Sequence, residues 1–89
     1  MERREEKLAV LYDLLLGLET REDCAGLLAD LCTVRELENM AERAYAAGLL
    51  MEGKTYNQVM AQADISSATL SRVSRCVQYG SGYSKFLKK

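Results

Sequence analysis

Proline and histidine are both absent from this chain of 89 residues, and only 7% of its residues are aromatic. Without proline, little besides glycine and capping residues interrupts a helix, and β-branched residues are sparse. The absence of histidine removes the commonest general acid–base group and a principal zinc ligand. We therefore expect an all-α protein that is poorly equipped for acid–base catalysis.

Cysteine is scarce as well. The three cysteines, Cys24, Cys32 and Cys76, are an odd number without C-x-x-C spacing. This pattern favours free, mostly buried thiols over a metal site.

Long hydrophobic runs are missing too. The longest apolar stretch, residues 8–18, is interrupted by Asp13 and is too short to cross a bilayer. The first residues also do not resemble a secretion signal. We therefore expect a cytoplasmic protein that has no membrane partner.

Negative charge is missing from the end of the chain, although the net charge is −1. Residues 1–53 contain six Lys and Arg against twelve Asp and Glu, a net charge of −6. Residues 54–89 contain six Lys and Arg against Asp64 alone, a net charge of +5. Such an asymmetry indicates a polyanionic partner for the basic half.

Apolar periodicity and capping residues predict five to six helices in one domain, residues 1–89. Five of the helices are expected at residues 5–18, 21–31, 34–52, 56–63 and 67–79. Gly80, Ser81 and Gly82 are expected to form a hinge before a basic tail, residues 81–89. The proposed N-caps are Thr20, Thr33, Thr55 and Ser66.

Apolar residues in the first two thirds of the chain indicate a second subunit. The helix at 5–18 is apolar around most of its circumference, and fewer than ninety residues offer little to cover it. We therefore predict that residues 1–53 form the dimerisation helices of a homodimer. The predicted inner stripe of the long helix is Leu37, Met40, Ala41, Ala44, Gly48 and Met51.

Residues 54–80 have the pattern of a helix-turn-helix, because two short helices are separated by a tight turn. In the second helix, Leu70, Val73 and Val77 share one face, and the opposite face carries arginines and hydroxyls without a carboxylate. Arginine pairs with guanine, hydroxyls bond to bases or phosphates, and a helix N-terminus attracts phosphate. We predict contacts to double-stranded DNA from Lys54, Ser66, Ser67, Ala68, Thr69, Ser71, Arg72, Arg75 and Tyr79.

A longer stretch around this helix, residues 31–83, reads LCTVRELENMAERAYAAGLLMEGKTYNQVMAQADISSATLSRVSRCVQYGSGY. It resembles the tryptophan-repressor superfamily, and in particular its YerC/YecD group, whose signature is ATxSRVxRCxxYGSGGY. The resemblance implies an intertwined all-α homodimer that presents two helix-turn-helix heads to an operator. The implied function is sequence-specific regulation of transcription, by repression.

The same resemblance implies an effector site. Arg43 and Arg72 stand where two family arginines enclose a corepressor, and Thr33 matches a threonine of that pocket. Cys76 stands where a serine helps to hold the amino group of the ligand, and a thiol is a weaker hydrogen-bonding group. A small amino-acid-like corepressor therefore fits the resemblance, whereas the thiol disfavours tryptophan itself.

Other readings of these residues stay open. Arg43 could instead form an ion pair with Glu38, Glu42 or Glu52 on its own helix. Asp64 stands in the turn where glycine is usual, a position that commonly needs positive φ.

Two other functions compete with DNA binding. One is a small all-α enzyme resembling chorismate mutase, in which arginines hold an anionic substrate. The other is a degenerate helix-turn-helix that serves only protein association.

Overall fold

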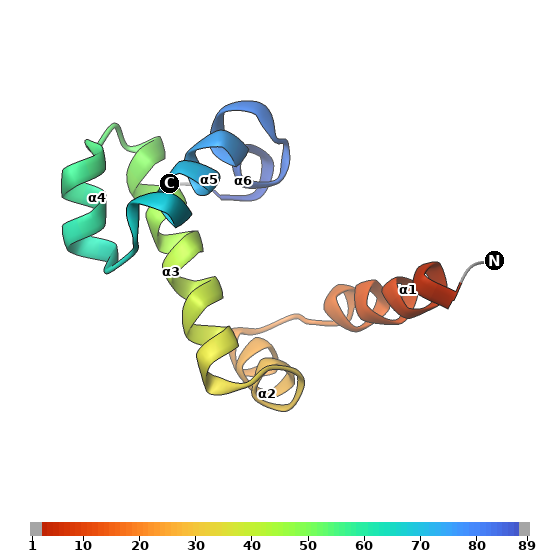
Figure 1. Ribbon diagram of the computed structural model, residues 1–89. Coiled ribbons are helices and arrows are strands. Elements are labelled where there is room, and N and C mark those ends of the chain that lie inside the picture. The colour runs from red at the N-terminus through yellow and green to blue at the C-terminus, as the bar shows by residue number, and fades with distance from the viewer. Residues whose placement is uncertain (1–2, 88–89) are drawn as a thin grey trace. The chain divides into compact units, whose positions relative to one another are not determined.

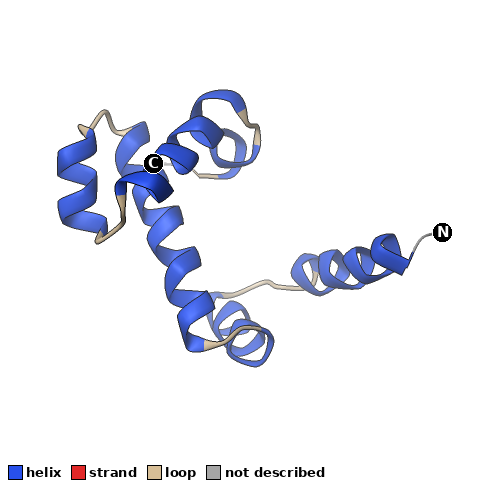
Figure 2. Ribbon diagram, in the orientation of Figure 1, coloured by secondary structure: helices blue, strands red, loops and turns tan. Residues whose placement is uncertain are grey.

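The computed structural model describes residues 3–87, which form six helices and no strand, so the all-α prediction is confirmed (Figure 2). Figure 1 labels the helices along the chain. They are α1 (Arg3–Leu16), α2 (Arg21–Leu31), α3 (Val34–Met51), α4 (Tyr56–Ala63), α5 (Ser67–Tyr79) and α6 (Gly82–Phe86). The chain divides into two compact units, Met1–Thr33 and Val34–Lys89.

The first unit contains α1 and α2. Thr20 caps α2 as predicted, because its hydroxyl oxygen accepts the Asp23 N–H at 3.0 Å. The Asp23 carboxylate in turn accepts the Glu19 N–H at 3.1 Å. These bonds satisfy backbone donors that a helix start leaves without partners, and they fix the first residue of α2.

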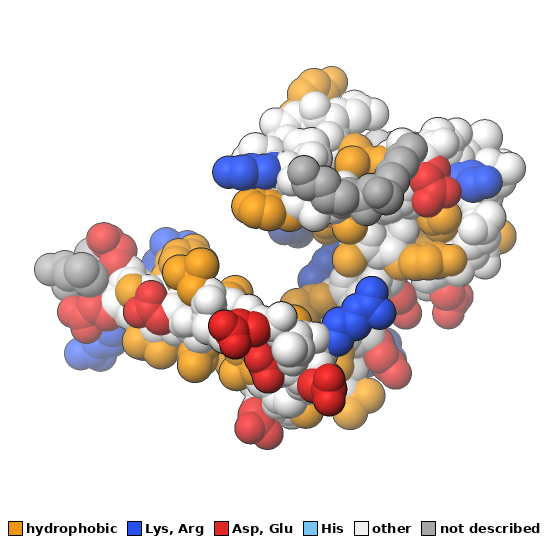
Figure 3. Space-filling model, turned by 180° about the vertical axis from the view of Figure 1, so that it is seen from behind, with side chains coloured by type: hydrophobic (Ala, Val, Ile, Leu, Met, Phe, Trp, Pro, Cys, Tyr) orange, Lys and Arg blue, Asp and Glu red, His pale blue; other side chains and the backbone are white. Residues whose placement is uncertain are grey.

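Neither α1 nor α2 has a buried side chain. Val10 and Leu16 of α1 are 63% and 82% exposed, and Tyr12, Leu14 and Leu15 are exposed as well. Figure 3 shows hydrophobic side chains along the surface of this helix. Helices α1 and α2 therefore carry apolar side chains without burying any of them.

The second unit has a core, to which α3, α4 and α5 all contribute. Its buried apolar residues are Ala46, Ala47, Leu49, Val59, Ala63, Ile65, Leu70 and Val73. Fully buried Leu70 and Val59 are the largest side chains at its centre. Burial of one such side chain stabilises the fold by about 1.5–3 kcal/mol.

The predicted inner stripe of α3 is only partly right, because four of its six members, Leu37, Met40, Gly48 and Met51, are half-buried and none is buried. The structure buries Ala46, Ala47 and Leu49 in the C-terminal part of the helix, and it leaves Ala41 and Ala44 exposed. The reason is that α4 and α5 pack against the face that carries Ala46 and Ala47. The small side chain of Ala47 lets these helices approach α3 closely.

The sequence allowed a sixth helix but did not place it, because the Gly80-Ser81-Gly82 segment was expected to be a hinge. The structure places Gly82–Phe86 in a helix whose Tyr83, together with Leu87 directly after it, packs against the core. These two contacts give the short helix a tertiary partner that its own sequence does not reveal. The last two residues of the predicted basic tail, Lys88 and Lys89, lie outside the described residues.

Candidate nucleic-acid interface

The start of α4 is fixed by a capping box. The Thr55 hydroxyl oxygen accepts the Gln58 N–H at 3.2 Å, and the Gln58 side-chain oxygen accepts the Thr55 N–H at 2.9 Å. Just before it, Gly53 has a φ of 91°, which terminates α3. Lys54 lies exposed between the two helices.

The turn between α4 and α5 depends on Asp64. Its backbone is left-handed, with φ 54° and ψ 47°, and its N–H donates to the Met60 carbonyl at 3.2 Å. The sequence indicated positive φ at this position, and the structure has it. Aspartate tolerates this conformation better than most residues with a side chain. The turn sets the direction in which α5 leaves α4.

Ser66 caps α5. Its hydroxyl oxygen accepts the Thr69 N–H at 3.2 Å, and its hydroxyl group donates to the Thr69 hydroxyl oxygen at 3.0 Å. The first turn of α5 contains no acidic residue. The positive end of the helix dipole at Ser67 and Ala68, both exposed, therefore meets no carboxylate of this turn.

The two faces of α5 differ as the sequence predicted. Leu70 and Val73 are buried and Val77 is half-buried, so this face holds the helix against the core. Most of the residues predicted to contact DNA are exposed, with Thr69 half-buried. The exposed ones are Lys54, Ser66, Ser67, Ala68, Ser71, Arg72, Arg75 and Tyr79.

A shallow hollow of about 520 Å³ joins part of this set. It is lined by Ala68, Ser71, Arg72, Arg75 and Cys76. Lys54 and Tyr79 do not line it, and Tyr79 is 83% exposed near the end of α5. The structure thus brings Ala68, Ser71, Arg72 and Arg75 of the predicted interface together around one hollow.

Ser74 is buried on the inner face of α5 and was missed by the sequence reasoning. Its hydroxyl oxygen accepts the Gln78 side-chain N–H at 3.4 Å. A signal existed, because Ser74 lies four residues after Leu70 and one residue after Val73, on the core side of the helical wheel.

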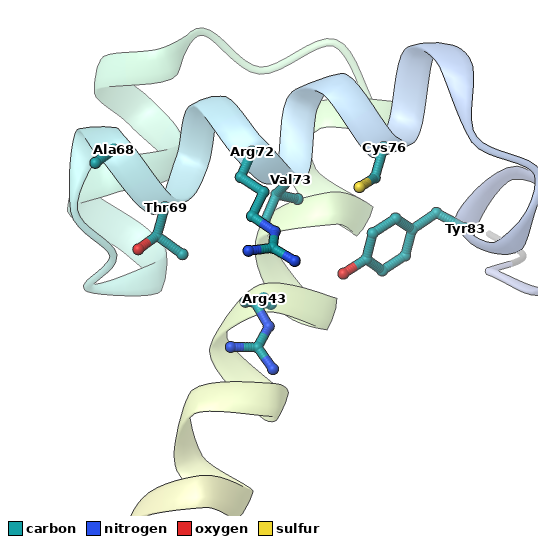
Figure 4. A pocket seen from close by; sticks show the side chains of 7 residues that line it. All are labelled: Arg43, Ala68, Thr69, Arg72, Val73, Cys76 and Tyr83. Carbon is teal, nitrogen blue, oxygen red and sulfur yellow. The ribbon is translucent and has the colours of Figure 1, made fainter. Parts of the chain in front are cut away.

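A second hollow, of about 500 Å³, lies where α3, α5 and α6 meet. Its lining residues are Arg43, Ala68, Thr69, Arg72, Val73, Cys76 and Tyr83. Figure 4 shows the Arg72 side chain reaching from α5 toward Arg43 on α3, the Arg43 guanidinium group turned away from α5, and the Tyr83 hydroxyl pointing toward the space between the two side chains. Three of the four predicted effector residues, Arg43, Arg72 and Cys76, are therefore close together.

Thr33, the fourth predicted effector residue, belongs to the first unit and does not line this hollow. Its role stays a prediction. Tyr83 was missed, because nothing in the sequence around it indicates that α6 turns back toward α3.

The competing reading of Arg43 finds no support in the structure. Among residues 3–87, Arg43 forms no ion pair with Glu38, Glu42 or Glu52. Arg43 lines the hollow instead, with its side chain running along α3 (Figure 4).

The thiols are more exposed than the sequence predicted. All three are free, but Cys24 and Cys32 are half-buried and Cys76 is exposed. Helices α1 and α2 bury no side chain and do not enclose Cys24 and Cys32, and Cys76 lies on the outer side of α5. Within the described part of the chain, no three acidic or cysteine side chains are arranged to hold a metal ion.

None of the helices in residues 3–87 combines the length and the apolar character that a bilayer crossing requires.

Comparison with known proteins agrees with this geometry. Residues 6–89 match the family described as Trp repressor protein. The uncharacterized protein YerC of Bacillus subtilis (strain 168) is 39% identical over 77 residues, which is 86% of this chain and 74% of that protein. A crystal structure of a protein from Staphylococcus aureus, assigned as a Trp repressor, superimposes with a TM-score of 0.84 at 33% identity. The match covers 98% of this chain and 91% of that chain.

Proposed function

Because this chain belongs to the Trp repressor family, we propose that it is a sequence-specific DNA-binding regulator of transcription that acts as a homodimer. Its helix-turn-helix, α4 and α5, reads the operator, and its role is repression. A protein with this role works beside the DNA, so we place it in the cytoplasm.

One observation carries the proposal: the outer face of α5 exposes Arg72 and Arg75 beside hydroxyls, after a first turn without a carboxylate. Guanidinium groups on such a face can bond to guanine or to phosphate, and the helix N-terminus favours an anion. The Ser66 cap and the Asp64 turn support the reading, because they fix the start and the direction of this helix.

The exposed apolar side chains of α1 support the homodimer. Leaving an apolar helix without any buried residue is unfavourable, because each Å² of apolar surface that stays in water lacks about 25 cal/mol of the stabilisation that burial would give. A second copy of the chain supplies an equally apolar surface. Two α5 helices in a symmetric dimer would enter successive major grooves, about 34–36 Å apart.

The enzyme reading is weaker. No Asp or Glu among residues 3–87 is buried, and the chain has no histidine, so the arginines would have to act by electrostatics alone. Reading α5 only as a module for protein association leaves its exposed arginine face without a role.

The experiment begins with selection of bound sequences from random duplex DNA by the full-length protein. Binding of the selected duplex is then measured by fluorescence anisotropy for wild type, Arg72→Ala and Arg75→Ala. We expect each change to weaken binding by about 1–3 kcal/mol without loss of thermal stability, because both side chains are exposed. Arg21→Ala, which removes an exposed arginine of α2, is the matched control. Equal affinity of all four proteins would refute the assignment.

A further inference from the structure

Helix α6 turns back onto the core directly after α5. The Gly80 N–H donates to the Cys76 carbonyl at 2.9 Å, and a Cβ on Gly80 would lie 2.7 Å from the same oxygen. A side chain at this position would therefore force the turn to shift. Glycine at position 80 therefore allows the chain to turn back closely. The sequence had instead predicted a hinge at this position.

Two anchors hold α6 in place. Tyr83 and Leu87 both pack against the core, and the Leu87 N–H donates to the Tyr83 carbonyl at 2.9 Å. The Leu87 Cδ2 atom lies 3.7 Å from where a Cβ on Gly48 would be, so Leu87 rests on α3. Helix α6 is therefore attached to α5 through the turn and to α3 through Leu87.

This arrangement places the Tyr83 ring between two hollows. One is the hollow of about 500 Å³ that contains Arg43 and Arg72. The other is an apolar hollow of about 400 Å³, which Tyr83 lines with Cys76 and Phe86. The half-buried ring is a wall of both.

The hydroxyl of Tyr83 points toward the space between the side chains of Arg43 and Arg72, which line the same hollow. The guanidinium groups of Arg43 and Arg72 have no ion-pair partner among residues 3–87, and like charges in one space repel. Oxygen acceptors on the lining side chains come from Tyr83 and Thr69, and the Thr69 oxygen already accepts a bond from Ser66. The structure contains no hydrogen bond between Tyr83 and either arginine, but a phenolic oxygen is an acceptor, and a side-chain rotation of Arg43 or Arg72 would bring a donor to it.

We propose that Tyr83 is a built-in ligand of the recognition helix: its ring and hydroxyl brace α5 against α3 from within the chain, so operator binding needs no free effector. A ring tethered four residues beyond α5 has an effective concentration of about millimolar or more, which a free ligand of the same intrinsic affinity must exceed to replace it. This inference rests on the proposed function, because its readout is DNA binding.

The first test uses wild type alone. Binding of the selected duplex is measured with no addition and with millimolar L-tryptophan, indole or 4-methylphenol. We expect full affinity without addition and less than a threefold change with any of the three. A tenfold or greater gain with any of them would overturn the inference while leaving the proposed function intact. If wild type bound no duplex under any of these conditions, the proposed function would fail, and the inference would fail with it.

The second test removes the ring. Tyr83→Ala should lose at least tenfold in affinity for the selected duplex while keeping its helical circular dichroism and its oligomeric state. Millimolar 4-methylphenol, which is the Tyr83 side chain as a free molecule, should restore affinity in this variant and leave wild type unchanged. Phe86→Ala is the matched control, because it removes a 75% exposed ring of α6 that does not line the arginine hollow.

Two further variants keep the inference testable if Tyr83→Ala fails to fold. Tyr83→Phe retains the ring, and its affinity for the selected duplex should fall by less than about tenfold. Tyr83→Leu retains apolar volume without the ring, and it should bind the duplex more weakly than Tyr83→Phe does. Wild-type affinity in both Tyr83→Ala and Tyr83→Leu, or in Tyr83→Leu alone when Tyr83→Ala does not fold, would overturn the inference.

Discussion

The two compact units of this chain use their apolar residues in different ways. Residues 34–87 bury Leu70, Val59 and Val73 almost completely, whereas α1 and α2 bury no side chain at all. Yet α1 is rich in leucine. The comparison shows that apolar content alone does not make a core. It is consistent with the proposed homodimer, in which a second copy of the chain would cover α1.

The comparison predicts that a core residue of the second unit carries the largest share of stability. Leu70→Ala should lower the free energy of unfolding by about 2–5 kcal/mol, because it leaves a cavity at a position with no exposed surface. Chemical denaturation at fixed protein concentration measures this loss. The control Phe86→Ala should stay within about 0.5 kcal/mol of wild type. Equal stability of the two variants would mean that Leu70 is not central to the core.

A charge in α1 tests the partner of the first unit. Leu15→Asp should weaken dimerisation by about 3 kcal/mol, which is roughly a hundredfold in the dissociation constant, because the homodimer would bury an unpaired carboxylate. Sedimentation velocity at micromolar concentration should then show monomer. The control Asp13→Asn changes an exposed residue of the same helix and should leave the dimer intact. A Leu15→Asp protein that sediments as wild type does would contradict the assignment of α1 to dimerisation.

The turn of the helix-turn-helix is expected to give the smallest effect. Asp64→Val should cost about 1–2 kcal/mol in thermal unfolding, because a β-branched residue fits the left-handed backbone at φ 54° poorly. Asp64→Gly is the control and should stay within about 1 kcal/mol of wild type, since glycine adopts this conformation freely but gains entropy in the unfolded chain. If valine were tolerated as well as glycine, the turn would not depend on its backbone conformation.

The sequence predicted best where local chemistry decides the structure. The bounds of α2, α4 and α5 match the prediction, because Thr20, Thr55 and Ser66 each form the capping bond that their residue type indicates. Helix α1 instead runs from Arg3 to Leu16, two residues earlier than expected at both ends. No strong capping residue marked its start.

The sequence predicted worst where a distant segment decides the structure. The inner stripe of α3 was partly misplaced, because alanines are spread around that helix and only the packing of α4 and α5 selects Ala46 and Ala47. For the same reason, Tyr83 was not recognised as part of the arginine hollow: α6 reaches it only by returning over α3. The exposed face with Arg72 and Arg75 could be predicted, because helical periodicity alone places it opposite Leu70 and Val73.

The salt dependence of DNA binding tests the central claim most directly. For the selected duplex, the logarithm of the association constant should fall linearly with the logarithm of salt concentration, by about 0.9 for each phosphate neutralised. For two recognition helices that each contact two or three phosphates, we predict a slope of about −4 to −5. Replacing Arg72 and Arg75 together by alanine should make the slope shallower by at least one unit. A slope near zero for wild type, or the same slope in both proteins, would contradict the claim that this face of α5 binds the DNA backbone.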